Sequence, residues 1–139
     1  MGDLYSIIGE DIISEEERLQ IYFFAGFFVK ENNFINGYLI DCFFEPSFIL
    51  GILNENKLDF IQNYSDNQII INQFKYNKEL EIFTGKAITK DAEIESNCRV
   101  YSYIKNFNLE GAPRNYMEIL SQVYSEILGF DINSGKKSK

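Results

Sequence analysis

Short apolar runs alternate with turn-forming residues through the middle of the chain. Runs rich in Ile, Phe, Tyr and Leu recur at roughly ten-residue intervals, separated by segments that contain Asn, Asp or Gly. Asn and Asp accept the backbone conformations of tight turns, so this spacing is typical of an antiparallel sheet folded as a sandwich or barrel. We expect seven strands, at Gln20–Lys30, Phe34–Phe44, Ser47–Leu53, Lys57–Tyr64, Gln68–Tyr76, Glu79–Ile88 and Asn97–Phe107.

Several of these strands have two different faces. Leu58, Phe60 and Tyr64 share one face of their strand, and in the last strand Cys98 and Val100 share another. A period of two with one polar face is what a half-solvated antiparallel sheet requires. Glycine inside a strand usually marks a bulge, a bend or a close approach of two backbones, which helps a sheet to coil. Such glycines stand at Gly26, Gly37, Gly51 and Gly85.

The first apolar run, Ile21–Val29, is apolar on both faces, so periodicity alone does not separate a buried strand from a buried helix. Ser14 followed by Glu17 resembles a capping box, which would let a helix run from Glu15 toward Lys30. Because the run is dense in aromatic and β-branched residues, we expect a strand there and a short N-terminal helix ending near Leu19.

A second helix is predicted near the C-terminus. Pro113 suits a helix start, and Gly129 is placed to end the helix. Apolar residues between them repeat at helical spacing, which predicts an amphipathic helix packed on the sheet. These residues are Tyr116, Met117, Leu120, Val123, Tyr124, Ile127 and Leu128.

The patterns together predict a mainly β (α+β) fold: an antiparallel β-meander, curled or barrel-like, with a short N-terminal helix and an amphipathic C-terminal helix packed on the sheet. A chain of 139 residues is the size of one domain. We expect a single globular domain over residues 1–132 and a disordered basic tail over residues 133–139. The longest apolar run, IYFFAGFFV, is too short to cross a bilayer as a helix, and no signal peptide is evident. We therefore expect a cytoplasmic protein that does not bind membranes, with Cys42 and Cys98 reduced.

Charge indicates the sign of a partner. The chain carries 21 acidic and 13 basic residues, for a formal net charge of −8. Such a field repels nucleic acid and speeds encounter with a basic protein. The candidate partner-binding acids are Glu10, Asp11, Glu15, Glu16 and Glu17 near the N-terminus, and Asp91, Glu93 and Glu95, which would share one side of an extended chain.

Candidate interface aromatics accompany these acids in the last predicted strand. Tyr101 and Tyr103 alternate on one face with Arg99 and Lys105. Tyrosine is a common interface anchor because it buries area while keeping a polar tip. Catalytic chemistry has no comparable signal: the chain lacks histidine, its cysteines stand alone, and no phosphate-binding loop occurs. We expect no enzymatic activity, no metal and no cofactor.

Two resemblances extend these expectations. The segment Gly37–Tyr64 resembles small bacterial meander proteins in the placement of Gly37, Asp41, Gly51, Phe60 and Tyr64, whereas Phe44 stands where glycine would be more usual. The whole chain, which is small, acidic and rich in Ile, Asn and Lys, resembles immunity proteins of bacterial polymorphic toxin systems, including contact-dependent growth inhibition.

The second resemblance implies a non-enzymatic immunity protein. Such a protein would bind and neutralise a basic toxin domain, often a nuclease, by blocking its active site or substrate surface. The alternative is a lipocalin-like binder of a small apolar ligand, since up-and-down barrels often enclose apolar cavities. The alternative predicts a sizeable internal cavity, whereas the inhibitor predicts a filled interior and an acidic outer patch.

Overall fold

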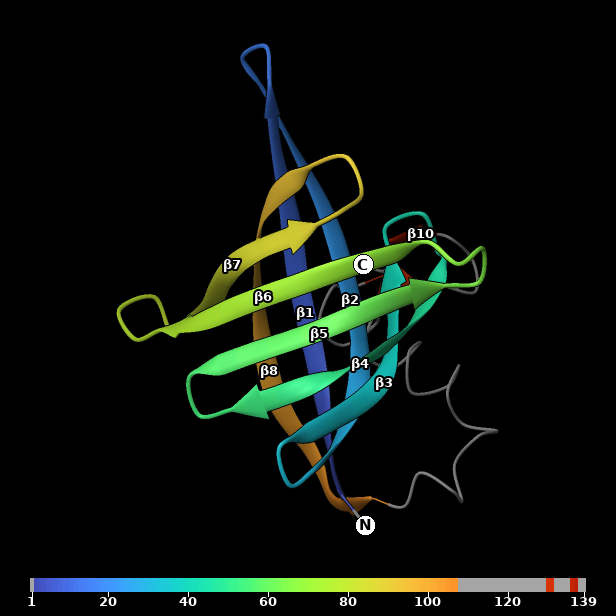
Figure 1. Ribbon diagram of the computed structural model, residues 1–139, viewed down its shortest axis with the longest axis vertical. Helices are drawn as coiled ribbons and strands as arrows, with labels where there is room; N and C mark the ends of the chain where they lie inside the picture. Colours follow the sequence, from blue (N-terminus) through green and yellow to red (C-terminus); the bar gives the residue numbers. More distant parts are fainter. Residues whose placement is uncertain (1, 108–129, 132–135, 138–139) are drawn as a thin grey trace.

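Eight antiparallel strands follow one another around a closed barrel in the computed structural model (Figure 1). The structure describes residues 2–107, 130–131 and 136–137, with side chains up to residue 102. Each strand pairs with the next, and β1 pairs with β8 to close the ring. The strands are β1 Gly2–Glu15, β2 Arg18–Glu31, β3 Phe34–Asp41, β4 Pro46–Asn54, β5 Lys57–Tyr64, β6 Ile69–Asn77, β7 Ile82–Ile88 and β8 Glu93–Phe107. A separate two-stranded ladder joins β9 Phe130–Asp131 and β10 Lys136–Lys137.

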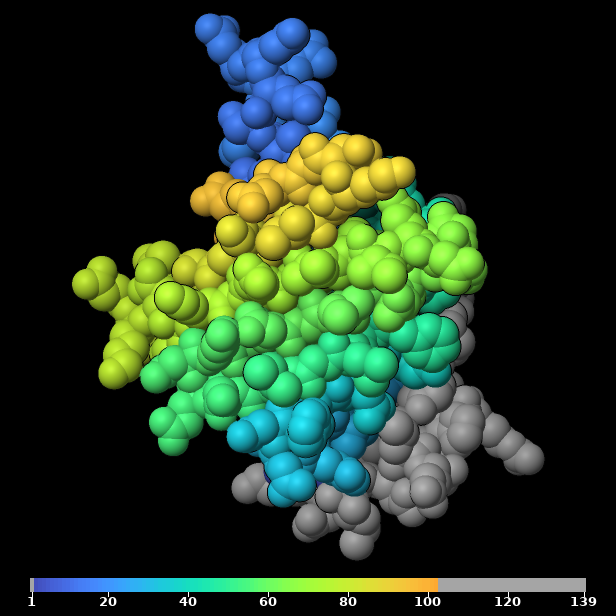
Figure 2. Space-filling model, viewed as in Figure 1, coloured from blue at the N-terminus to red at the C-terminus, as the bar shows by residue number. Residues whose placement is uncertain are grey.

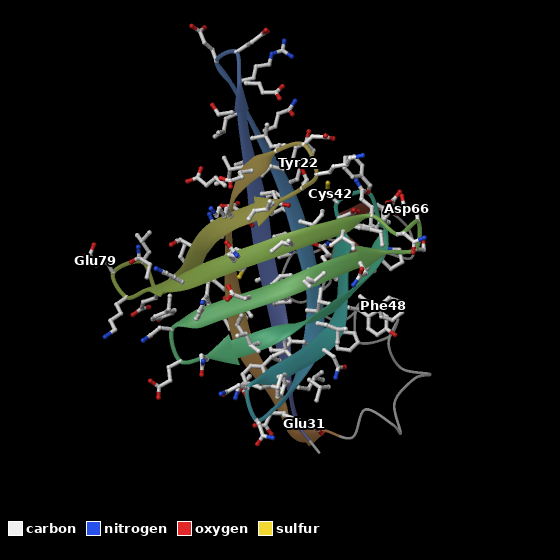
Figure 3. The ribbon with its side chains drawn as sticks, in the orientation of Figure 1. Tyr22, Glu31, Cys42, Phe48, Asp66 and Glu79 are labelled. Atoms are coloured by element: carbon white, nitrogen blue, oxygen red, sulfur yellow. The ribbon has the colours of Figure 1, made fainter. Side chains whose placement is uncertain are left out.

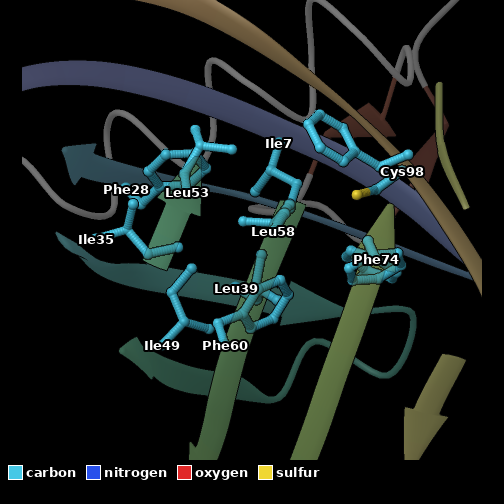
Figure 4. Close-up of a cluster of buried hydrophobic side chains, with 12 residues drawn as sticks. Ile7, Phe28, Ile35, Leu39, Ile49, Leu53, Leu58, Phe60, Phe74 and Cys98 are labelled. Atoms are coloured by element: carbon cyan, nitrogen blue, oxygen red, sulfur yellow. The ribbon is translucent and has the colours of Figure 1, made fainter. Parts of the chain in front are cut away.

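The barrel interior is filled by apolar side chains from all eight strands (Figure 4). Eight strands leave an interior that side chains are just able to fill. Phe28, Leu58 and Phe74 are almost fully buried there, and the rings of Phe60 and Phe74 stack at 5.9 Å. Cys98 also lies in this core as a free thiol, and burial raises its pKa, whereas Cys42 is an exposed free thiol. The antiparallel, barrel-like meander is therefore confirmed.

Inward-facing glycines let neighbouring strands come close together. A Cβ on Gly26 would meet the carbonyl oxygen of Tyr38, and a Cβ on Gly37 would meet the carbonyl oxygen of Phe27. Gly51 approaches Asp59 of β5 in the same way, and Gly85 approaches Gln73 of β6. Of the three roles expected for strand glycines, a bulge, a bend or a close backbone approach, these four show the close approach.

The predicted N-terminal helix is wrong, because the described residues contain no helix and this region forms a hairpin. β1 runs through to Glu15 and pairs with β2 in an unbroken register. Glu16 and Glu17 form the connecting two-residue turn with φ of 44° and 66°, positive at both positions as a type I′ hairpin turn requires. Of the eight barrel strands, β1 is the one that the sequence did not predict. The predicted C-terminal helix lies outside the described residues.

All seven predicted strands are confirmed, and all except Lys57–Tyr64 have shifted ends. β3 ends at Asp41, because the following turn places Phe44 at φ 63°. β7 begins at Ile82, after a turn in which Glu81 has φ 57°, and β8 begins at Glu93. Residues 20–30 form a strand as expected, and their outward side chains as well as their inward ones are buried from 25 to 29. Burial on both faces explains why that run shows no alternation.

The β1–β2 hairpin is longer than the barrel wall and projects from it (Figures 1 and 2). Pairing of β1 with β8 stops at Ile12, and pairing of β2 with β3 stops at Phe24. We call residues 13–23 the arm; among the described strands, they pair only within the β1–β2 hairpin. The end of the barrel from which the arm projects is the arm end, where Tyr22, Cys42 and Asp66 lie; Glu31 and Glu79 mark the opposite, far end (Figure 3).

Candidate functional site

The tip of the arm concentrates negative charge in an exposed position. Glu15, Glu16 and Glu17 are all exposed, and Arg18 is the only basic residue of the arm. The tip of the arm therefore holds three consecutive carboxylates beyond the barrel wall. Repulsion among them is weakened by water, but together they present a local negative field to an approaching molecule.

One face of the arm is apolar although it is open to solvent. Alternation along β2 puts Leu19, Ile21 and Phe23 on the outward face, where they are 64%, 42% and 47% exposed. Ile21 pairs directly with Ile12 of β1, which extends the apolar surface across the hairpin. No described strand pairs with the outer edges of this ribbon, and an open strand edge is a template for another chain.

The base of the arm joins a second group of acids on β8. Glu10 pairs with Asn97 and Ile12 pairs with Glu95, so Glu10 and Glu95 are diagonal neighbours on the outer surface. A hollow of about 250 Å³ opens beside Glu10, and Phe23 and Arg99 also line it. The arm base thus combines an apolar ring, a carboxylate and a recess.

The other predicted site residues on β8 and in the loop before it do not join the arm base. Glu93 lies on the same strand as Glu95, but its carboxylate is 3.5 Å from the ammonium nitrogen of Lys86. Asp91 is exposed in the β7–β8 loop. Tyr101 is 45% exposed on the outer face of β8, opposite Ser6 and away from the arm base. Tyr103 lies in β8, and its side chain is outside the described residues.

Asp11 does not share the outer surface with Glu10. Alternation turns its side chain inward, and it pairs with Ser96, which is buried. Among the described residues its Oδ1 atom is buried without a hydrogen-bond partner. Burial raises the pKa of Asp11; the Ser96 hydroxyl lowers it, and the neighbouring charge of Asp41 raises it.

A polar network that the sequence did not predict lies inside the arm end. Tyr64 donates its hydroxyl to Asp41 Oδ2 at 3.0 Å, and Gln62 Nε2 donates to Tyr64 at 3.1 Å and to Ser47 at 3.0 Å. Asn72 Nδ2 donates to Gln62 Oε1 at 3.3 Å. Burial, followed by the charge of Asp41, raises the pKa of Tyr64, so its hydroxyl keeps the proton that it donates. The signal that could have revealed the network is the inward register of Gln62, between Phe60 and Tyr64.

Asp41 also shapes the β3–β4 turn. Its Oδ1 accepts hydrogen bonds from the backbone N–H groups of Phe43 at 2.9 Å and Glu45 at 3.0 Å. Between them Phe44 adopts a left-handed backbone, at the position where a glycine would be more usual. The ring of Phe43 lies 5.9 Å from that of Tyr22, so this turn contacts the root of the arm.

The raised pKa of Asp11 predicts a pH-dependent stability effect. The Asp11 carboxyl holds its proton more tightly in the native state than in the unfolded state. Its contribution to the free energy of unfolding is therefore complete below the ordinary carboxyl pKa, about 4, and is lost as the pH rises through the raised pKa of the native state. We expect Asp11→Asn to raise the free energy of unfolding relative to wild type near neutral pH, and this gain to shrink near pH 3. Urea denaturation of both proteins near pH 7 and near pH 3 measures this difference in the free energy of unfolding.

The matched control is Asp91→Asn, which alters an exposed loop carboxylate and should change stability by no more than about 0.5 kcal/mol at either pH. A gain for Asp11→Asn that grew on acidification would contradict the assignment of a raised pKa.

Comparison with known proteins returns no relative for this chain: no protein-family model matches it, and no curated protein or solved structure gives a significant match. None of the described residues forms a helix with the length and apolar character needed to span a lipid bilayer. Among the same residues, no three Cys, Asp or Glu side chains come together as ligands for one metal ion.

Proposed function

We propose that this protein is a non-enzymatic, cytoplasmic immunity protein whose arm binds a basic protein partner. The partner on this proposal is a toxin domain, neutralised when the arm covers its active site or its substrate surface. The observation that carries the proposal is the projecting arm, which joins an exposed apolar face to an acidic tip. The resemblance in size, charge and composition to immunity proteins supports the same class.

The chemistry of the arm suits a stable protein interface. Leu19, Ile21 and Phe23 offer apolar area at the centre, and carboxylates surround them at the tip and base. Binding energy in protein interfaces comes mainly from a few buried apolar or aromatic anchors, whereas charges at the rim raise the association rate. The negative sign of the rim favours a partner rich in Lys and Arg over a second copy of this acidic chain.

Charge reversal at the tip tests the electrostatic role of the arm. The probe is the protein encoded by the neighbouring gene, first isolated by pull-down with the full chain. We expect E15K/E16K/E17K to lower its association rate about tenfold at low salt, and the difference to fade as salt screens the charges. Surface plasmon resonance at several salt concentrations measures both quantities.

The control for charge is E55K/E79K/E81K, which makes the same change in net charge at exposed positions of the far end. This control variant should keep most of the wild-type association rate. Equal losses for the two triple variants would mean that net charge alone, rather than the arm, steers the partner.

Ile21→Ser tests the apolar face in the same assay. We expect it to raise the dissociation rate about tenfold, because Ile21 lies at the middle of the exposed stripe. Ile61→Ser is the control: Ile61 is 44% exposed on the outer face of β5, close to the 42% of Ile21. A faster dissociation for Ile61→Ser than for Ile21→Ser would place the interface on the barrel wall and reject the arm.

A further inference from the structure

A hollow of about 730 Å³ opens at the far end of the barrel, opposite the arm. Its volume lies within the range of about 300–1,000 Å³ that is typical of pockets for small molecules, which often occupy barrel mouths. The floor is formed by Leu53, Phe83 and Val100, where the apolar core reaches the surface. The interior beyond this floor is filled, so a ligand would sit in the mouth rather than in an internal cavity.

Two tyrosines line the hollow, and each is held by a second ring. The ring of Tyr5 stacks on Phe28 with centroids 5.4 Å apart and an interplanar angle of 13°. The ring of Tyr76 meets Phe83 edge-on at 5.3 Å. These contacts fix the aromatic walls before any ligand arrives, which lowers the entropic cost of binding.

The rim is fixed by hydrogen bonds between turns and neighbouring strands. The N–H of Leu53 donates to the carbonyl of Asn33 at 2.8 Å, and the N–H of Tyr76 donates to the carbonyl of Asn56 at 2.8 Å. Asn33, Asn54 and Asn56 line the opening and make its rim polar. The far end is therefore an apolar recess with a polar, ordered rim.

Two lysines, Lys30 and Lys57, and one glutamate, Glu55, line this mouth. Lys30 is half-buried at an inward position of β2 and lines the hollow. Asp3 lies directly opposite Lys30 in the β1–β2 ladder, but no carboxylate of the described residues forms an ion pair with Lys30. Lys57 at the rim is 3.4 Å from Asp59. Glu55 also borders the opening, but it is exposed to solvent. A half-buried ammonium beside an apolar floor favours an anionic group on whatever enters.

We propose that the far-end mouth binds a small apolar molecule that carries one anionic group, with its apolar part against Phe83 and Val100 and its anion at Lys30. A carboxylate, a sulfonate or a phosphate monoester on an alkyl or aromatic body shares this chemistry. The site is separated from the arm by the length of the barrel. It does not depend on the proposed binding of a basic protein.

Displacement of a fluorescent anion tests the site in the full chain. The probe is anilinonaphthalene sulfonate, and the competitors are decanoate, decanol and decyltrimethylammonium, which share one chain length but differ in head-group charge. We expect saturable binding of the probe, with decanoate competing about tenfold better than decanol and the cation competing worst.

Lys30→Met should lower the affinity for decanoate about tenfold and leave that for decanol unchanged. Lys86→Met removes the same charge from the outer face of β7 and should change neither affinity. If Lys30→Met does not fold, Asn54→Trp, which places a large ring at the rim, should weaken both decanoate and decanol.

Three outcomes would overturn the proposal: no saturable binding of the probe, equal competition by decanoate and decanol, or equal losses in Lys30→Met and Lys86→Met. None of them bears on the arm, because that proposal is measured with a protein partner.

Discussion

Replacing Gly26 with alanine is expected to lower the free energy of unfolding by about 3 kcal/mol, at the upper end of the usual cost of overpacking. The sign is opposite to the common effect of this substitution, since Ala in place of Gly stabilises by about 0.4–1 kcal/mol where space and backbone permit. Here the new methyl group would meet the carbonyl oxygen of Tyr38. That oxygen belongs to a paired backbone, which cannot move without opening the β2–β3 ladder.

Gly37→Ala should have a similar effect, because its methyl group would meet the carbonyl oxygen of Phe27 across the same pair of strands. One separation of β2 from β3 would relieve both contacts, so we expect the double variant to lose less than the sum of the single losses. Urea denaturation measures all three, and Asn36→Ala, at an exposed outward position of β3, is the control. A neutral or stabilising Gly26→Ala would mean that the strands do not approach closely there.

The middle strands could be predicted because each has one buried and one exposed face. In β5, Leu58 and Phe60 are buried while Lys57 and Ile61 are exposed, and Asn- or Asp-containing turns mark both ends. The hairpin at the N-terminus could not be predicted in the same way. Two glutamates with positive φ are poor turn residues, so nothing local marks that turn; the long ladder between β1 and β2 imposes it.

The candidate sites could be predicted only in part, because they too depend on how the strands pair. The acids near the N-terminus stood out by charge, but whether Glu10 or Asp11 faces outward depends on β1 being a strand. The far-end hollow depends on which turns meet at one end of the barrel. In a meander every second turn lies at the same end, so the turns near Asn33, Asn56 and Lys78 could have been grouped from the strand order alone.

Replacing Asp41 with alanine is expected to destabilise the protein by about 3 kcal/mol, because one carboxylate holds both a turn and a buried hydroxyl. Its loss frees two backbone N–H groups of the β3–β4 turn and leaves the hydroxyl of Tyr64 without its acceptor. The left-handed backbone of Phe44 would then lose the bonds on either side that hold it. Hydrogen bonds to charged groups contribute about 1.5–3 kcal/mol each, and their contributions are not additive when the bonds share one carboxylate.

Two further variants separate the roles of Asp41. Tyr64→Phe removes only the hydroxyl and should cost about 1–2 kcal/mol, while Asp41→Asn keeps an acceptor for the turn and should fall between wild type and Asp41→Ala. Equilibrium urea denaturation of the four proteins in the Asp41→Ala and Tyr64→Phe cycle gives their coupling energy, which we expect to be about 1 kcal/mol. Additive losses would show that the hydroxyl and the carboxylate do not stabilise each other, and that Asp41 acts through the turn alone.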